Sequence, residues 1–197
     1  INYAGSNKNY GPSIKFSSYQ SLQEKPVLNI NSGVIDSVNS NNLSIVNLYD
    51  GKISSNSTFN DLNVYNGVVG SSNDDVVNIS GDLYVENGEF KAAIGSSTNY
   101  VKNVKILNGK VYLIYAETLT LGEKDGVVND YPILQNVPET KKFNYYDGTI
   151  QHTSTVLSFT PVDDIEEGYD IKIDSKKTVT LSQNSTVGFE YNGTVYY

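Results

Sequence analysis

Leu62-Asn63-Val64-Tyr65-Asn66-Gly67-Val68-Val69 is the stretch of sequence that decides the fold. Its first and third residues are apolar and lie on one face of a strand, while the residues that alternate with them lie on the other face. Asn66-Gly67 then supplies two residues that accept a positive φ, so the chain can turn a corner. The valine pair that follows begins the next side.

The same pattern occurs six times in the chain. The other copies occupy residues 28–35, 46–53, 83–90, 104–111 and 143–150. The glycines of the first five copies are separated by 18, 16, 21 and 21 residues. A recurring unit of about 20 residues is typical of a solenoid, in which each turn buries its apolar face only against its neighbours. The sequence predicts an all-β fold, a right-handed parallel β-helix with rungs of roughly 16–22 residues.

Overlaying the copies predicts which residues stack on one another. The inward columns are Leu28, Val46, Leu62, Leu83, Val104 and Phe143, and Ile30, Leu48, Val64, Val85, Ile106 and Tyr145. The outward columns are Asn29, Asn47, Asn63, Tyr84, Lys105 and Asn144, and Asn31, Tyr49, Tyr65, Glu86, Leu107 and Tyr146. Ser32, Asp50, Asn66, Asn87, Asn108 and Asp147 form a column of corner residues, chosen for backbone geometry.

The outward columns allow two interpretations. Asn and Tyr tolerate an exposed strand and stack on themselves, as they do in cross-β assemblies. The functional interpretation is a flat platform for a sugar ring or a partner protein, since exposed aromatic rings and amide donors suit both. The candidate ligand-binding residues are Tyr49, Tyr65, Asn47, Asn63, Tyr84 and Tyr146.

Composition excludes several classes of function. The net charge is −8 and all 14 basic residues are Lys, which argues against binding to nucleic acid or to anionic lipid. No apolar run reaches the length of a membrane span, so we expect no membrane insertion. The lack of Cys excludes disulfides and cysteine-ligated metals, and no cofactor is expected. The lack of Met predicts that the chain is a piece of a longer protein.

The repeat also suggests how the chain is organised. Residues 1–26 lack it and are predicted to be a cap or an irregular first rung, residues 27–150 are the clear array, and residues 151–197 are less regular rungs of the same domain. The spacing doubles between Gly109 and Gly148, where residues 119–126 are a variant copy with a longer turn. Residues 189–195 are a shortened copy.

Four segments carry a resemblance to a known family. They read TLTLGEKDG at 118–126, YPIL at 131–134, FNYYDGTI at 143–150 and IEEGYDI at 165–171. This wording resembles the repeat block of long cell-surface proteins of Gram-positive gut bacteria, which are β-solenoid adhesins or stalks. The resemblance covers about a quarter of the chain. It implies a location at the cell surface, outside the cell, and a structural or adhesive role, and it carries no catalytic residues.

Parallel β-helices also include enzymes that act on polysaccharides, so catalysis has to be considered. His152 is the one histidine, and a single loop histidine is more often incidental than a base or a metal ligand. The carboxylate pairs Asp74-Asp75 and Asp163-Asp164 match no motif of a glycosidase, and neighbouring strand residues point to opposite faces. The acidic stretch 163–170 lacks the spacing of known Ca²⁺ loops and is interpreted as solvated.

The sequence thus favours a non-enzymatic bacterial cell-surface module, an adhesin or stalk segment that projects from the cell and binds a host protein or glycan. The alternative is a fragment of a carbohydrate-active β-helix enzyme. An ice- or surface-binding solenoid is a remote third interpretation, because the outward columns lack regular Thr.

Overall fold

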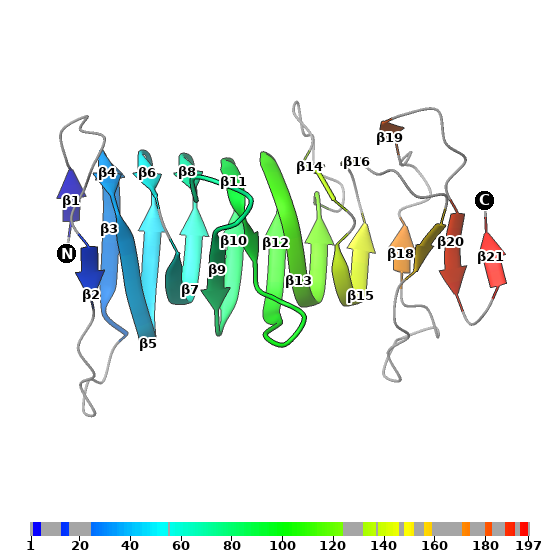
Figure 1. Cartoon of the computed structure of the whole chain (residues 1–197), viewed down its shortest axis with the longest axis horizontal. Helices are drawn as coiled ribbons and strands as arrows, with labels where there is room; N and C mark the ends of the chain where they lie inside the picture. Colours follow the sequence, from blue (N-terminus) through cyan, green and yellow to red (C-terminus); the bar gives the residue numbers. More distant parts are fainter. Residues whose placement is uncertain are drawn as a thin grey trace.

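In the computed structural model of the protein, the regular secondary structure of the described residues is β-strand. The structure describes residues 2–4, 13–15, 25–54, 56–123, 132–136, 138–145, 148–151, 156–158, 171–173, 180–182, 188–191 and 194–196. Within these ranges there is no helix, and the strands follow one another along a single long axis (Figure 1). Parallel strands stack as a β-solenoid of about six turns. The predicted all-β fold with parallel stacking is confirmed.

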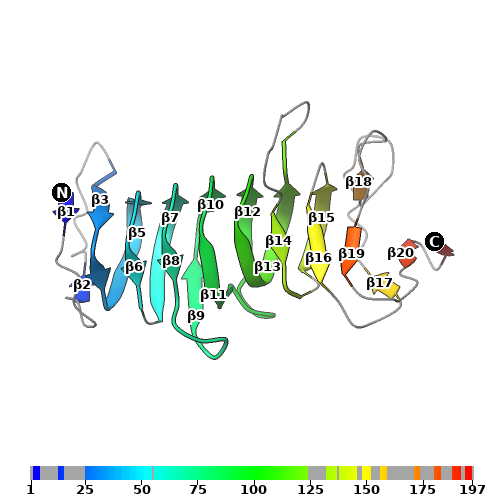
Figure 2. The same cartoon turned by 90° about the horizontal axis from the view of Figure 1, so that it is seen from above.

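The turns from β3 to the middle of β13 have three described sides, which we call A, B and C in chain order, and the later turns have strands described on sides A and B. The turns are seen from above in Figure 2. Side A contains β1 (Asn2–Ala4), β3 (Val27–Ser32), the ends of β5 (Ser37–Leu48), β7 (Ser57–Val64) and β13 (Lys110–Leu121), and β10 (Asp82–Val85), β12 (Val101–Ile106), β15 (Glu139–Tyr145) and β18 (Ile171–Ile173). Side B contains β4 (Val34–Ile35), β6 (Lys52–Ile53), β8 (Val68–Val69), the starts of β11 (Glu89–Ile94) and β13, and β14 (Ile133–Leu134), β16 (Thr149–Gln151) and β19 (Thr180–Ser182). Side C contains β2 (Ser13–Lys15), the starts of β5 and β7, β9 (Val76–Ile79), the end of β11 and the middle of β13.

The inward columns predicted from the repeat form the core of side A. The first runs in register through Leu28, Val46, Leu62, Leu83, Val104, Leu119 and Phe143, all buried. The second runs through Ile30, Leu48, Val64, Val85, Ile106 and Leu121, also buried, and continues to the main chain of Tyr145. Like residues therefore bury against like residues on the neighbouring turns, as the solenoid prediction requires.

The glycines of the repeat are the corners between sides A and B. Gly51 has φ 102° and Gly109 has φ 105°, in the region that favours glycine, and their column partners share a positive φ. Main-chain hydrogen bonds also link the corners of successive turns from Gly33 to Pro132. For example, the N–H of Lys110 donates to the carbonyl oxygen of Gly88 over 2.8 Å. The predicted role of these glycines is confirmed.

The doubled gap between Gly109 and Gly148 contains two turns of unequal length. Val104 pairs with Leu119, and the number of residues between these two partners is smaller than the shortest predicted rung. Leu119 then pairs with Phe143, and Phe143 pairs with Ile171, and both of these steps are longer than predicted. The predicted range of rung lengths is therefore too narrow. The extra residues of these steps fall between strands, and the strands on either side of them stay in register.

Pro132 occupies the corner of this longer turn. The N–H of Ile133, the residue after it, donates to the carbonyl oxygen of Gly109 over 2.8 Å. On the next turn, a Cβ atom added to Gly148 would lie 2.8 Å from the carbonyl oxygen of Pro132. Gly126, the glycine of the predicted variant copy, lies outside the described residues.

The last strands depart from the solenoid pattern. β17 (Val156–Ser158), β20 (Gly188–Tyr191) and β21 (Thr194–Tyr196) form a separate sheet in which β20 and β21 are antiparallel, with Phe189 opposite Tyr196. Residues 189–195 were predicted to be a shortened copy of the repeat, and in this respect the prediction is wrong. The two strands are separated in sequence by Asn192-Gly193, and Asn-Gly between two short strands is also the strongest sequence signal for a hairpin. The boundaries at residues 26 and 150 stay predictions.

Candidate functional site

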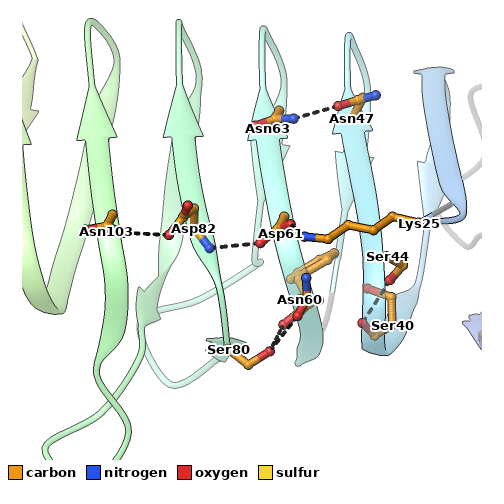
Figure 3. A network of polar contacts seen from close by, with 11 residues as sticks. Lys25, Ser40, Ser44, Asn47, Asn60, Asp61, Asn63, Ser80, Asp82 and Asn103 are labelled. Carbon is orange, nitrogen blue, oxygen red and sulfur yellow. Dashed lines mark hydrogen bonds and ion pairs between the residues drawn. The ribbon is translucent and has the colours of Figure 1, made fainter. Parts of the chain in front are cut away.

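An asparagine ladder runs along the outward face of side A. The Nδ2 of Asn47 donates to the Oδ1 of Asn29 over 2.8 Å, and the Nδ2 of Asn63 donates to the Oδ1 of Asn47 over 2.9 Å. Figure 3 shows the second of these bonds. The predicted stacking of this column is confirmed. Because a carboxamide has two N–H donors, the ladder leaves the second N–H of Asn47 and Asn63 unused.

Two tyrosines stack beside this ladder, as their positions in the repeat predict. Tyr49 and Tyr65 directly follow β5 and β7 on successive turns. Their ring centroids are 4.8 Å apart and the ring planes differ by 7°. The ring of Tyr84 approaches that of Tyr65 from the following turn, with centroids 6.2 Å apart and planes inclined by 63°. The structure thus brings these three predicted residues together.

The stacking changes how this cluster can bind. Since Tyr49 and Tyr65 cover one face of each other, the pair offers ring edges to solvent between them, and the predicted flat platform is not formed there. The second face of Tyr49 lies on the side of Asn31, because the N–H of Tyr49 donates to the carbonyl of Ile30. Asn31 is too small to cover an aromatic ring. Tyr49 is accordingly 43% exposed, whereas Tyr65 and Tyr84 are half-buried.

Tyr84 closes the aromatic cluster at its other end. It follows Asn63 in the ladder column and precedes Lys105, which forms an ion pair with Glu123 over 2.8 Å. Burial raises the pKa of Tyr84 above its ordinary value, and the carboxylate of Glu86 adds to this increase. Tyr84 therefore stays a neutral hydrogen-bonding group over the physiological range. Tyr146, the sixth predicted ligand-binding residue, lies outside the described residues.

A charged network lies on the same side, one column away from the asparagines (Figure 3). The Nζ of Lys25 lies 2.6 Å from the Oδ2 of Asp61, two turns further on. The N–H of Asp82 donates to the Oδ1 of Asp61 over 3.1 Å, and the Nδ2 of Asn103 donates to the Oδ1 of Asp82 over 2.8 Å. These polar groups tie four turns together, and the repeat alone did not indicate them.

A second tyrosine cluster was missed by the sequence reasoning. The rings of Tyr100 and Tyr115 meet at 86° with centroids 6.1 Å apart. The hydroxyl of Tyr100 donates to a carboxylate oxygen of Glu139, and the Nζ of Lys141 lies 5.5 Å from the centroid of the same ring. Lys141 also pairs with Glu117 over 3.3 Å. These contacts join residues of different turns to one another, which favours a role in holding turns together.

Tyr100 provides a test of this cluster. The hydrogen bond to Glu139 raises the pKa of Tyr100 to about 12. Glu139→Gln is expected to bring that pKa back toward 10, measured by NMR titration of ring-labelled tyrosine. Since the pKa is higher in the folded chain, the stabilisation is complete below pH 10 and is lost as the pH rises from 10 to 12. A Tyr100 pKa that does not change in the variant would contradict the contact.

The described carboxylates do not gather into a group that could hold a metal ion. Asp75, one of the carboxylate pair considered above, accepts hydrogen bonds from the main-chain N–H groups of Ser71 at 2.7 Å and Ser72 at 2.9 Å, so it stabilises a turn. Among the described residues, no three His, Cys, Asp or Glu side chains gather in a way that could hold a metal ion. His152, Asp163, Asp164 and the stretch 163–170 lie outside these residues.

Within the described part of the chain there is no helix with the length and hydrophobicity of a membrane span. No protein-family model matches the chain, and comparisons with curated proteins and with solved structures also find no match. The function of the chain is therefore inferred from its fold and from the arrangement of its side chains.

Proposed function

We propose that this chain is a non-catalytic bacterial cell-surface module, an adhesin or stalk segment that projects from the cell and binds a host glycan through side A. The exposed ring of Tyr49 beside the amide of Asn47 is the observation that carries the binding role. The elongated stack of turns supports a projecting role, because each added turn lengthens the molecule along the same axis. The resemblance to Gram-positive surface repeats is the basis for the location.

The chemistry of Tyr49 and its neighbours suits a sugar ring. A pyranose presents a flat set of C–H groups that packs on the face of an aromatic ring, and its hydroxyls pair with amide N–H groups at the rim. Tyr49 is 43% exposed and its second face lies on the side of the small Asn31, and Asn47 has one N–H that the ladder does not use. The site therefore accommodates one sugar unit at the Asn31 side of the stack, with the rest of the glycan running across side A.

The proposal predicts the effect of removing the exposed ring. Tyr49→Ala is expected to weaken glycan binding about tenfold, the worth of one aromatic contact. The double variant Tyr49→Ala with Tyr65→Ala is expected to lose binding further, because the single change uncovers a face of Tyr65 that replaces it in part. Binding is measured by calorimetry with a glycan selected on an array.

A control variant and a parallel assay accompany this experiment. Tyr112→Ala changes a half-buried tyrosine away from side A and is expected to leave binding unchanged. Normal binding by the double variant would place the ligand elsewhere on the chain, and binding only to a protein would exclude the glycan. A parallel assay for turnover of neutral and acidic polysaccharides tests the alternative. Turnover that one carboxylate substitution abolishes would replace the adhesin proposal with a carbohydrate-active enzyme.

A further inference from the structure

Three corners of the solenoid carry the dipeptide Asn-Gly at the same structural position. They are Asn66-Gly67, Asn87-Gly88 and Asn108-Gly109, and the turn before them has Asp50-Gly51 at this position. Asn66 and Asn87 are exposed and Asn108 is half-buried, so water reaches all three. One column of the fold thus contains both an amide and the corresponding acid in the same local geometry.

An asparagine followed by glycine is prone to a reaction within the chain. The main-chain nitrogen of the glycine loses its proton and forms a bond to the Cγ of the asparagine. The bond from Cγ to Nδ2 breaks, and the side-chain NH2 group takes up a proton and leaves as ammonia. Water then opens the resulting five-membered imide to either aspartate or isoaspartate. Glycine favours the first step because it has no Cβ to block the approach, and asparagine is among the thermolabile residues for this reason.

The corner at Asn108 brings the reacting groups together. The N–H of Gly109 donates to the Oδ1 of Asn108 over 2.6 Å, which holds the nitrogen beside the side-chain carbonyl and polarises that carbonyl. Asp50 has the equivalent contact, from the N–H of Gly51 to its Oδ1 over 2.7 Å. Among the corner residues that the structure describes, this contact is found at these two positions. Asp50 also shows that the acid fits the corner.

We propose that Asn108 is a site of spontaneous deamidation, which converts its Asn-Gly corner into an Asp-Gly corner. Aspartate is the product that the fold accommodates, because isoaspartate lengthens the main chain by one methylene group. The carbonyl oxygens of Gly88 and Gly109 are each held by an N–H of the next turn at 2.8 Å, and a longer corner breaks that register. Each conversion adds one negative charge to a chain that already carries −8.

The test is to incubate the folded protein at pH 7.4 and 37 °C and to follow each asparagine by peptide mapping with mass spectrometry. The Asn108 peptide is expected to deamidate several-fold faster than those of Asn66 and Asn87, with aspartate as the major product. A peptide of the same sequence serves as the unfolded reference. Faster conversion at Asn66 or Asn87, or isoaspartate as the major product in the folded chain, would overturn the assignment.

The chain supplies its own control variant. Asn108→Ser introduces the residue that the first corner has at Ser32, so it is expected to fold normally and to abolish the conversion at this site. Asn108→Asp imitates the product and is expected to melt close to the parent protein, as Asp50 predicts. A large drop in the melting temperature of Asn108→Asp, with Asn108→Ser unaffected, would show that the corner rejects the acid.

Discussion

Gly109→Val is expected to destabilise the protein by about 3 kcal/mol or more. Gly109 has φ 105°, where a β-branched side chain is strongly disfavoured. An added Cβ would also fall against the main chain of the previous corner, including the nitrogen of Gly88 at 2.8 Å. Main-chain atoms cannot move aside as a flexible side chain does, so the two turns have to separate locally. Thermal and urea denaturation followed by circular dichroism measure the loss.

Lys110→Val is the matched control for this substitution. It introduces the same residue one position later, at an exposed place on side B where Val34 and Val68 occupy the equivalent column. Its effect on stability is expected to stay within about 0.5 kcal/mol. Equal melting temperatures for the two variants would mean that Gly109 does not have to be a glycine, and the corner interpretation would be wrong.

Phe59→Ala is expected to cost about 3–5 kcal/mol. Phe59 is fully buried on side C, where it pairs in register with Ser40 on the turn before and Ile79 on the turn after. Ser40 is a small neighbour, so the space left by the ring cannot be filled by a simple shift of that side chain. Because each turn contacts only its neighbours, hydrogen exchange is expected to accelerate most in β5, β7 and β9.

Thr58→Ala provides the comparison for this change. Thr58 is adjacent to Phe59 on the same strand but faces outward between Asn39 and Asn78, and it is half-buried. Its removal is expected to change the stability by less than about 1 kcal/mol. If Phe59→Ala were equally mild, side C would not be part of the core.

The sequence was sufficient to predict side A and its corners. Alternation followed by Asn-Gly or Asp-Gly specifies both the buried residue and the turn, so Leu62, Val64 and Gly67 occupy the predicted places. Side C was not predicted, although Phe59 and Ile79 are as well buried. Its strands end in no fixed turn dipeptide, and their distance from the glycine changes between turns. A pattern search that assumes a constant period therefore misses them.

The columns of the candidate residues were predicted from the sequence, but their side-chain geometry was not, and their role in binding stays a prediction. Column positions place Tyr49 next to Tyr65, yet they do not say whether the rings lie flat on the sheet or stack against each other. Stacking depends on side-chain torsions that the repeat does not determine. The Tyr100 cluster was missed for a different reason, since Tyr100 and Glu139 are 39 residues apart and the turns between them have unequal lengths.

The corner hydrogen bonds described above have a mechanical consequence. Bonds such as that from Lys110 to Gly88 run from one turn to the next along the long axis of the stack. A tensile force applied to the two ends of the stack pulls on all bonds between a pair of turns at once, so the load is shared across three sides. Failure then begins at a single interface between turns, while the turns on either side keep their contacts and act as a template on which the interface closes again when the force is released.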